Sequence, residues 1–277
     1  MIKKIFSRPT GIFSVLILSI IFFFAIFGQL IAPQGANEIN VVNMLQPPSA
    51  EHIFGTDELG RDVFSRTILS AQVSMQVSVI SVAFALFFGT AAGVMAGYFG
   101  GWLDNVLMRV VDVLFAFPVL LLALAIVAIL GPGIGTATFA LGVVYVPIFA
   151  RVARSSAVSV VQEPYVKAAK TVGASPARTI ITHLLPNIAA PLIVQTSVSL
   201  AFAILNEAAL SFLGLGAQPP TPTWGRMLFD AKGFLEQAWW MAVFPGATVF
   251  LTVLAFNLLG DNLRDALDVT VDRKESK

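Results

Sequence analysis

Long apolar stretches without charge alternate with short polar segments along the chain. A helix needs about 20 apolar residues to cross about 30 Å of hydrocarbon. By this measure, the pattern predicts six membrane-spanning helices, at about 11–32, 77–98, 106–130, 134–153, 179–217 and 237–260. The expected fold class is therefore an all-α integral membrane protein.

One short motif separates the third helix from the fourth. Residues 113–150 carry no charge, and as a single helix these 38 residues would measure about 57 Å, nearly twice what a bilayer needs. Gly131, Pro132 and Gly133 lie near the middle of this run. Because these residues break helices, two spans are predicted in place of one.

Basic residues determine the predicted orientation. With the N-terminus inside, thirteen of the 17 Lys and Arg residues fall on the inner side and four on the outer side. This asymmetry follows the positive-inside rule, so both termini are expected in the cytoplasm. Lys3, Lys4 and Arg8 precede an apolar run that is longer than the hydrophobic region of a secretory signal, so a retained anchor is expected.

The same pattern divides the chain into three parts. Residues 1–71 are predicted to hold the anchor helix and an external loop, and 269–277 a cytoplasmic tail. Between them, 72–268 would form a transmembrane core with a cytoplasmic loop at about 155–186.

Composition then narrows the classes of function. The chain is 57% hydrophobic and 12% charged, against about 45–50% and about 25% in soluble domains, so lipid must surround most of it. A net charge of +1 gives no reason to expect nucleic acid as a partner. There is no cysteine, and His52 and His183 are far apart in the sequence, so no metal site is expected.

The inner loop at about 155–186 has the pattern of two short helices. Pro164 suits the first turn of one helix, and Gly173 is expected to stop it. Ser175, followed by proline, looks like the cap of a second helix, which Pro186 would end or kink. Two interpretations compete: a docking element for another protein, and a solvated loop whose positive charge sets the topology.

This loop and four further blocks resemble a known family. Residues 167–169, Lys-Ala-Ala, followed by Gly173 and closed by the Leu-Pro pair at 185–186, resemble the Glu-Ala-Ala loop of ABC importer permeases. The other blocks are similar to the second permease of the dipeptide, oligopeptide and nickel importers, and they lie at 54–62, 207–216, 224–225 and 260–265.

The resemblance implies a half-channel with the type I ABC importer permease fold in a bacterial inner membrane. It would pair with a homologous second permease, two cytoplasmic ATPase subunits that bind ATP and Mg²⁺, and an external solute-binding protein. Di- or oligopeptides are the expected cargo, with nickel chelates, opines or glutathione as alternatives. The loop would be the coupling helix that contacts one ATPase, through Glu163, Tyr165, Lys167, Ala168, Ala169 and Gly173.

The sequence departs from the family pattern at two positions. Lys167 stands where the motif has Glu, so the ion pair of that Glu is not carried over, and Val269 stands where relatives often have Pro. No G-x-x-x-x-G-K-[ST] phosphate loop occurs. The chain is therefore not expected to be an enzyme or to hold a cofactor of its own.

Small residues recur every four positions in the second predicted span, at Ala85, Gly89, Gly93, Gly97 and Gly101. They form one smooth stripe along which another helix backbone can approach closely. The stripe is interpreted either as packing within the chain, which is the commoner case, or as the seam with a partner permease.

Glu207 is the one acidic residue deep in a hydrophobic stretch. A charged group there is costly unless it faces a cavity or a partner. It is a candidate for lining the outer mouth of a pathway, against the alternative of a structural cap for the Gly-rich loop that follows. The contrasting class is a transporter or channel driven by an ion gradient. Such a protein needs several ionisable groups in the membrane to form a relay, and Glu207 alone is weak evidence for one.

Charged residues are concentrated at the end of the first outer loop. Asp57, Arg61, Asp62 and Arg66 have the spacing of a short amphipathic helix lying on the membrane. Asp57, Arg61 and Asp62, together with Trp224 in the second outer segment, are candidate contacts for a solute-binding protein. A plug over the outer face is the alternative.

Overall fold

The computed structural model describes Phe6 and residues 8–267; Lys3, Lys4, Val269 and the predicted tail at 269–277 lie outside the described residues. The described part contains helices and no strand. Its elements are α2 (Pro9–Ile31), η1 (Val41–Asn43), α3 (Val63–Phe99), α4 (Gly101–Phe115), α5 (Val119–Leu130), α6 (Ile134–Val161), α7 (Pro164–Thr171), α8 (Pro176–Thr179), the π-helical turn η2 (Ile180–Leu184), α9 (Leu185–Phe212), α10 (Trp224–Ala231) and α11 (Trp240–Leu267).

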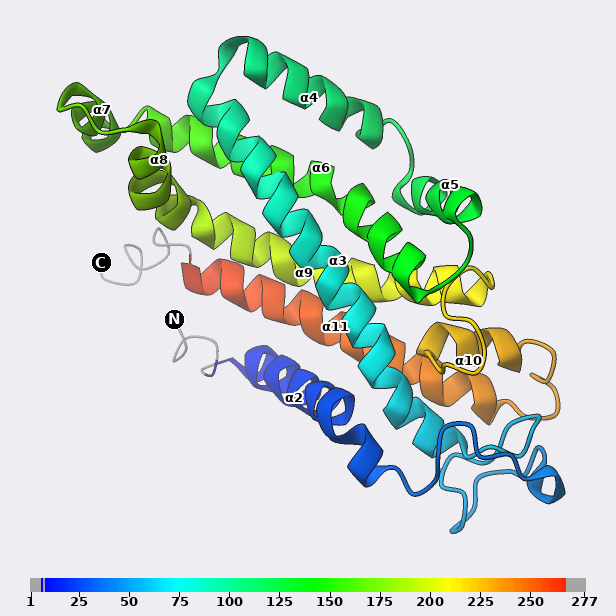
Figure 1. The fold of residues 1–277 in the computed structure, drawn as a ribbon. Helices are drawn as coiled ribbons and strands as arrows, with labels where there is room; N and C mark the ends of the chain where they lie inside the picture. The colour runs from blue at the N-terminus through cyan, green and yellow to red at the C-terminus, as the bar shows by residue number, and fades with distance from the viewer. Residues whose placement is uncertain (1–5, 7, 268–277) are drawn as a thin grey trace.

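Five long helices make up an elongated bundle (Figure 1). α2, α3, α6, α11 and the continuous run from α8 to α9 are each long and apolar enough to cross a membrane. The start of α2, the end of α11, α7 and α8 lie at one end of the bundle, and α10 lies toward the other (Figure 1). Arg8 at the start of α2 forms an ion pair with Asp265 of α11, so both described ends of the chain lie on the same side, as the orientation rule predicts.

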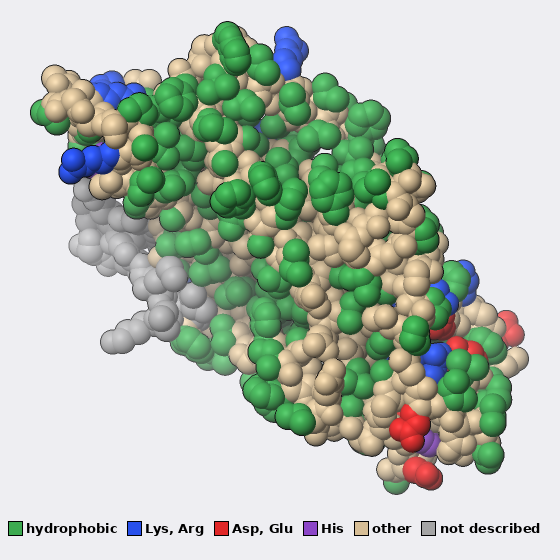
Figure 2. Space-filling view, in the orientation of Figure 1, with side chains coloured by type: hydrophobic (Ala, Val, Ile, Leu, Met, Phe, Trp, Pro, Cys, Tyr) green, Lys and Arg blue, Asp and Glu red, His purple; other side chains and the backbone are tan. Residues whose placement is uncertain are grey.

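The charged side chains on the surface also separate into two groups, one at each end of the bundle. Figure 2 shows charged side chains gathered mainly at the two ends of one face, with hydrophobic and uncharged side chains between them. Large apolar side chains in this middle zone are open, with Phe87 69% exposed and Phe250 63% exposed. Such a surface is stable against lipid or a partner helix and not against water.

The expected third span at 106–130 is not one helix. α4 ends at Phe115, α5 begins at Val119, and the two helices are bent by 88°. Pro118 explains the break, because proline lacks the N–H donor and disfavours the helical conformation of the residue before it. The prediction of a single helix is wrong here, and the sixth crossing exists only if the bent pair counts as one span.

The second span also differs from its prediction. α3 begins at Val63 and not near 77, because Asp62 caps it by accepting a hydrogen bond from the backbone N–H of Ser65. The Ser-rich turns that follow are buried within the protein, where Ser78 Oγ donates to the Ser74 carbonyl at 2.9 Å. Hydroxyls bonded back to their own helix make a polar stretch compatible with a buried helix.

The glycine stripe of α3 packs against α6 in the same chain. A Cβ atom at Gly93 would lie 2.2 Å from the Ala150 carbonyl oxygen, and one at Gly89 would lie 2.6 Å from the Val146 carbonyl oxygen. Backbones this close leave no room for a side chain. The stripe thus lies at an internal contact, the first of the two interpretations, and Gly97 extends it toward the cytoplasmic end.

Gly101 has a different role from the rest of the stripe. No atom lies within 4 Å of a Cβ built there, but its φ is +58°, next to Gly100 at +63°. Residues with a side chain rarely adopt this backbone conformation. The two glycines therefore serve the sharp turn from α3 into α4.

Gly93→Leu is expected to separate α3 from α6 and to cost more than the about 1–3 kcal/mol typical of overpacking. Thermal unfolding and monodispersity of the purified chain in detergent measure the effect. Ala91→Leu, on the exposed side of the same helix, is the control and should leave both readouts unchanged. Equal melting temperatures for the two variants would contradict the packing role of Gly93.

Candidate coupling surface and external charge cluster

The coupling segment, residues 162–184, begins where α6 ends. Helix α6 continues to Val161, so residues 155–161 of the predicted cytoplasmic loop are helical. Glu163 is extended and Pro164 occupies the first turn of α7, a position that needs no N–H donor. Val166 is completely buried in the same apolar cluster as Ala157 of α6, which fixes α7 to the end of the bundle.

The two short helices and the glycine between them occur where the sequence indicates. α7 stops before Gly173, whose φ is +84°, and Ser175 caps α8 by accepting from the backbone N–H of Arg178 at 3.3 Å. Pro186 does not end the second helix, so of the two expected effects, an end or a kink, the end does not occur. The π-helical turn η2 precedes Pro186, and a wider turn of this kind accommodates the missing donor of proline without breaking the helix.

The coupling segment exposes apolar side chains at the water-facing end of the bundle. Val172 is 84% exposed, Ile181 65% and Tyr165 44%. The predicted coupling residues Glu163, Lys167, Ala168 and Gly173 are also exposed, whereas Ala169 is half-buried. A convex element with apolar side chains next to lysines can insert into a groove on another protein.

Contacts connect this segment to several helices of the bundle. Lys170 Nζ lies 4.4 Å from the centre of the Tyr98 ring at the end of α3. The rings of Tyr165 in α7 and His183 in η2 meet edge to face, with their centroids 6.0 Å apart. Because α6 leads directly into α7 and η2 leads into α9, the coupling segment is connected to three membrane-crossing helices, α3, α6 and α9.

Glu207 does not line an open pathway in this structure. Its side chain is 2% exposed, and Ser211 Oγ donates to its Oε1 at 2.8 Å. The same Ser211 hydroxyl accepts from the backbone N–H of Ala217 at 3.4 Å. Glu207 is thus linked through Ser211 to the loop that follows α9, as the structural alternative expects, and a role in the pathway stays a prediction.

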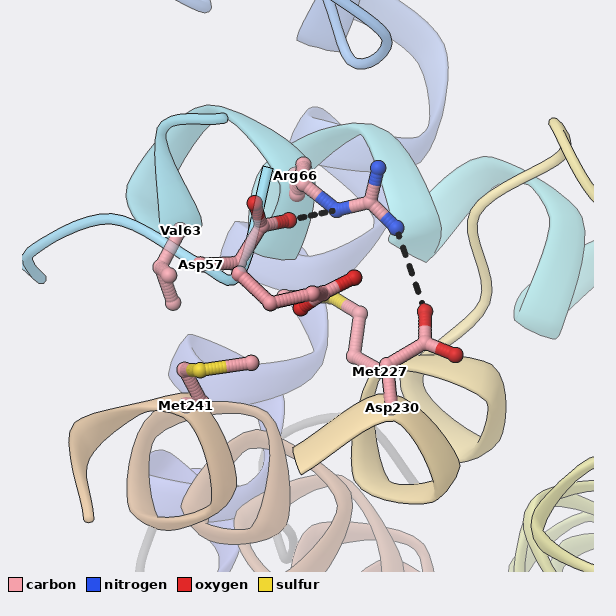
Figure 3. A pocket seen from close by; sticks show the side chains of 7 residues that line it. Asp57, Val63, Arg66, Met227, Asp230 and Met241 are labelled. Atoms are coloured by element: carbon pink, nitrogen blue, oxygen red, sulfur yellow. Dashed lines mark ion pairs between the residues drawn. The ribbon is translucent and has the colours of Figure 1, made fainter. Parts of the chain in front are cut away.

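At the opposite end of the bundle, a buried charge cluster consists of Asp57, Glu58, Arg61, Arg66, Arg226 and Asp230. Arg66 lies between Asp57 and Asp230 (Figure 3), with nitrogen–oxygen distances of 3.5 Å and 3.9 Å. Asp57 also pairs with Arg61 Nε at 2.6 Å. Three acidic and three basic side chains thus balance one another beneath the external loop.

The cluster is built on a turn and not on the predicted amphipathic helix. Thr56 and Asp62 form an isolated antiparallel bridge, and Asp57 Oδ1 accepts from the backbone N–H groups of Leu59 and Arg61. The prediction of a surface helix over these residues is wrong, because the Asp57 carboxylate satisfies backbone donors that close a tight turn.

The candidate contacts for a solute-binding protein are themselves inaccessible. Asp57, Asp62 and Arg61 are between 3% and 9% exposed, and Trp224 is completely buried with its indole N–H donating to the Thr67 carbonyl at 2.9 Å. These side chains cannot contact another protein in this conformation. They hold the external loop and α10 in place, and it is the loop surface that remains available to a partner.

Burial also changes the acidity of one member of the cluster. Burial, aided by the neighbouring negative charge of Asp57, raises the pKa of Glu58, while Arg61 opposes the shift. A raised carboxyl pKa means that folding favours the protonated form, so this group lowers stability as the pH rises past its ordinary value of 4.5. The arginines of the cluster limit that cost.

Sequence reasoning misses Asp230 and Arg226, which complete the cluster from α10. Arg226 Nε lies 2.9 Å from Asp230 Oδ1. Their spacing of four residues within a short amphipathic stretch is a signal for an ion pair on one helix face. Their approach to Arg66, more than 150 positions earlier, has no local signal in the sequence.

Comparison with known proteins gives consistent matches. Residues 89–273 match the family described as "Binding-protein-dependent transport system inner membrane component", and residues 1–48 match the "N-terminal TM domain of oligopeptide transport permease C". The chain is 47% identical over 266 residues to the dipeptide transport system permease protein DppC of Alkalihalophilus pseudofirmus, covering 96% of this chain and 88% of the relative.

It is also 45% identical over 245 residues to the glutathione transport system permease protein GsiD of Escherichia coli O6:K15:H31, covering 88% of this chain and 81% of the relative. A solved inward-facing structure of the MetNI methionine ABC transporter aligns with a TM-score of 0.58 and 18% identity, over 73% of this chain and 95% of that chain. A crystal structure of an amino acid ABC transporter with histidines aligns with a TM-score of 0.55 and 16% identity, over 74% and 95%.

Arg66→Met is expected to destabilise the folded chain by about 1.5–3 kcal/mol, because it removes the cation that Asp57 and Asp230 share and leaves them only Arg61 and Arg226. Chemical unfolding in detergent measures the change. Arg8→Met removes an exposed ion pair and serves as the control, with an expected cost of about 1 kcal/mol or less. An Arg66 variant as stable as the Arg8 variant would show that the cluster contributes nothing.

Proposed function

Because the chain belongs to the family of binding-protein-dependent transport system inner membrane components, we propose that it forms half of the pathway by which di- and oligopeptides enter a bacterial cell. It is a multi-pass permease subunit of an ABC importer in the inner membrane, with the type I fold. This membership sets aside the alternative of a transporter driven by an ion gradient.

The division of labour follows from what the chain contains. It has no phosphate-binding loop of the G-x-x-x-x-G-K-[ST] type. Energy for transport would therefore come from two partner ATPase subunits that bind ATP and Mg²⁺, and a homologous second permease would supply the other half of the pathway. The external loop over the charge cluster would receive a solute-binding protein.

The observation that carries this proposal is the exposed apolar surface of α7. Val166 anchors the helix from within, while Tyr165 and Val172 project from the cytoplasmic end of the bundle. A groove on an ATPase subunit would bury these side chains. Lys167 is exposed and replaces the acidic residue of the family motif, so the matching position on the ATPase should be acidic or neutral.

The assignment of peptides as substrate rests on the relatives. The dipeptide permease and the glutathione permease are about equally similar to this chain, at 47% and 45% identity. Glutathione is itself a tripeptide, so both names indicate small peptides as the substrate class. The dipeptide assignment is favoured by the longer match, and glutathione import is the second candidate.

Ala168→Trp is expected to block docking of α7, because it places a large ring on an exposed position of the coupling surface. Co-purification of the ATPase subunits with the permease pair should fall about tenfold or more, as expected for a disturbed interface centre. Val42→Trp, at an exposed position of the external segment, should leave ATPase retention unchanged. Full retention by Ala168→Trp would contradict a coupling role for α7.

The assembled importer, reconstituted with its binding protein, is expected to take up a labelled dipeptide in an ATP-dependent manner. Unlabelled di- and oligopeptides should compete, and nickel chelates should not. Uptake of glutathione with no uptake of dipeptides would replace the first substrate assignment by the second. Uptake by the lone chain without ATP would contradict the ABC mechanism altogether.

A further inference from the structure

A cavity of about 350 Å³ lies between α6, α9 and α11. Most of its lining is apolar, including Val152 of α6 and Pro191 and Val194 of α9. Its two polar lining residues are Gln195 of α9 and Arg264 of α11. The volume lies within the about 300–1,000 Å³ of small-molecule sites, and apolar surroundings with a few polar groups are typical of such sites.

This cavity extends from the cytoplasmic end of the bundle into the membrane-crossing part. Arg264 and Leu267 belong to the last turn of α11, which lies at the same end of the bundle as α7 and α8 (Figure 1). Gln195 lies ten residues after the start of α9 at Leu185, about 15 Å along the helix at 1.5 Å per residue. That length is about half the thickness of the hydrocarbon core. A solute in the cavity would therefore lie between the membrane interior and the cytoplasm.

Arg264 gives the cytoplasmic end of the cavity a positive charge. Its neighbour Asp265 pairs with Arg8. In the part of the chain that the structure describes, no carboxylate forms an ion pair with Arg264. A guanidinium presents a planar set of donors that binds a carboxylate through two parallel hydrogen bonds. This end of the cavity therefore suits an anionic group of a ligand.

Gln195 supplies the other polar group, deeper in the cavity. Its Nε2 donates to Ser199 Oγ at 3.1 Å, one turn further along α9, which orients the side chain. An amide side chain has two donor hydrogens and an acceptor oxygen, so one N–H and the carbonyl oxygen remain for a ligand. These two groups match the C=O and N–H of a peptide bond.

We propose that this cavity binds a short peptide before its release into the cytoplasm, with the C-terminal carboxylate at Arg264 and a peptide bond at Gln195. The side chains of the peptide would lie against the apolar lining. The inference rests on the proposed function and adds to it the residues that contact the substrate. A free phosphate or a lipid headgroup would use Arg264 alone and leave the amide of Gln195 without a partner.

The cavity lies between the two helices that the coupling segment joins. α6 ends at Val161, directly before this segment, and α9 begins at Leu185, directly after it. Both helices contribute lining residues. A change in the spacing of α6 and α9 would therefore alter the width of the cavity, so a peptide bound there would be held or released according to the position of the coupling segment.

Equilibrium binding of a labelled dipeptide to the assembled importer, without nucleotide and without binding protein, tests the proposal. The dipeptide with a free carboxylate is expected to bind about tenfold more tightly than the same dipeptide with an amidated C-terminus. Arg264→Gln, at an exposed position, should remove this preference by weakening the free acid alone. Arg264→Lys keeps the charge and should restore part of the preference.

A second variant and two matched controls separate the two contacts. Gln195→Leu removes the amide and should weaken the free acid and the amidated dipeptide to the same extent. Arg109→Gln removes an exposed arginine of α4, and Gln76→Leu removes an exposed glutamine of α3, both outside the cavity. Neither control should change binding. Inorganic phosphate and phosphatidylglycerol should fail to displace the dipeptide.

Equal binding of the acid and the amide to the unmodified importer, or an unchanged preference in Arg264→Gln, would overturn the proposal. Displacement by inorganic phosphate would show a site for any anion, and displacement by phosphatidylglycerol a site for a lipid headgroup. Each of these results leaves the proposed function in place as long as the same preparation, supplied with binding protein and ATP, takes up the dipeptide. Absence of that uptake would contradict the proposed function itself and this inference with it.

Discussion

The close approach of α3 and α6 is the constraint on which the rest of the structure depends. A Cβ atom at Gly93 would lie 2.2 Å from the Ala150 carbonyl oxygen, so the two backbones touch with no side chain between them. In a membrane, where no hydrophobic effect drives helices together, contact of this kind is a main source of association. The pair extends from one end of the bundle to the other. Elements at both ends are therefore attached to one tightly packed unit.

The two functional regions sit at opposite ends of this pair. The external charge cluster includes Arg66 near the start of α3, and α7 follows the end of α6 with Lys170 resting on Tyr98 of α3. A partner that moves α7 from the cytoplasm displaces helices whose far ends hold the external loop. The buried cluster suits this role, because ion pairs with little exposure resist separation more strongly than exposed pairs do.

The sequence predicts the apolar spans, the orientation and the helix–glycine–helix order of the coupling segment, since each has a local signal. It fails where long-range contacts decide. The serines in the first turns of α3 are buried against Trp224 and Met227, which are distant in the sequence. Arg66, which pairs with Asp57, is likewise brought beside Asp230 of α10 by the fold alone. The bend at Pro118 had a local signal that the length of the apolar run masked. Glu207 stands out in the sequence as an isolated charge, and its hydrogen-bond partner Ser211 lies one turn away in the same helix.

The central claim is that α7 is a cytoplasmic element moved by a nucleotide-hydrolysing partner. The chain has no cysteine, so a single introduced thiol can report the position of each end. Val172 and Val42 are both 84% exposed, one in the coupling segment and one in the external segment. In intact cells, Val42→Cys should react with a membrane-impermeant reagent, whereas Val172→Cys should be protected and should crosslink to an ATPase subunit. Labelling of Val172→Cys from outside, or capture of the ATPase by Val42→Cys, would contradict this mechanism.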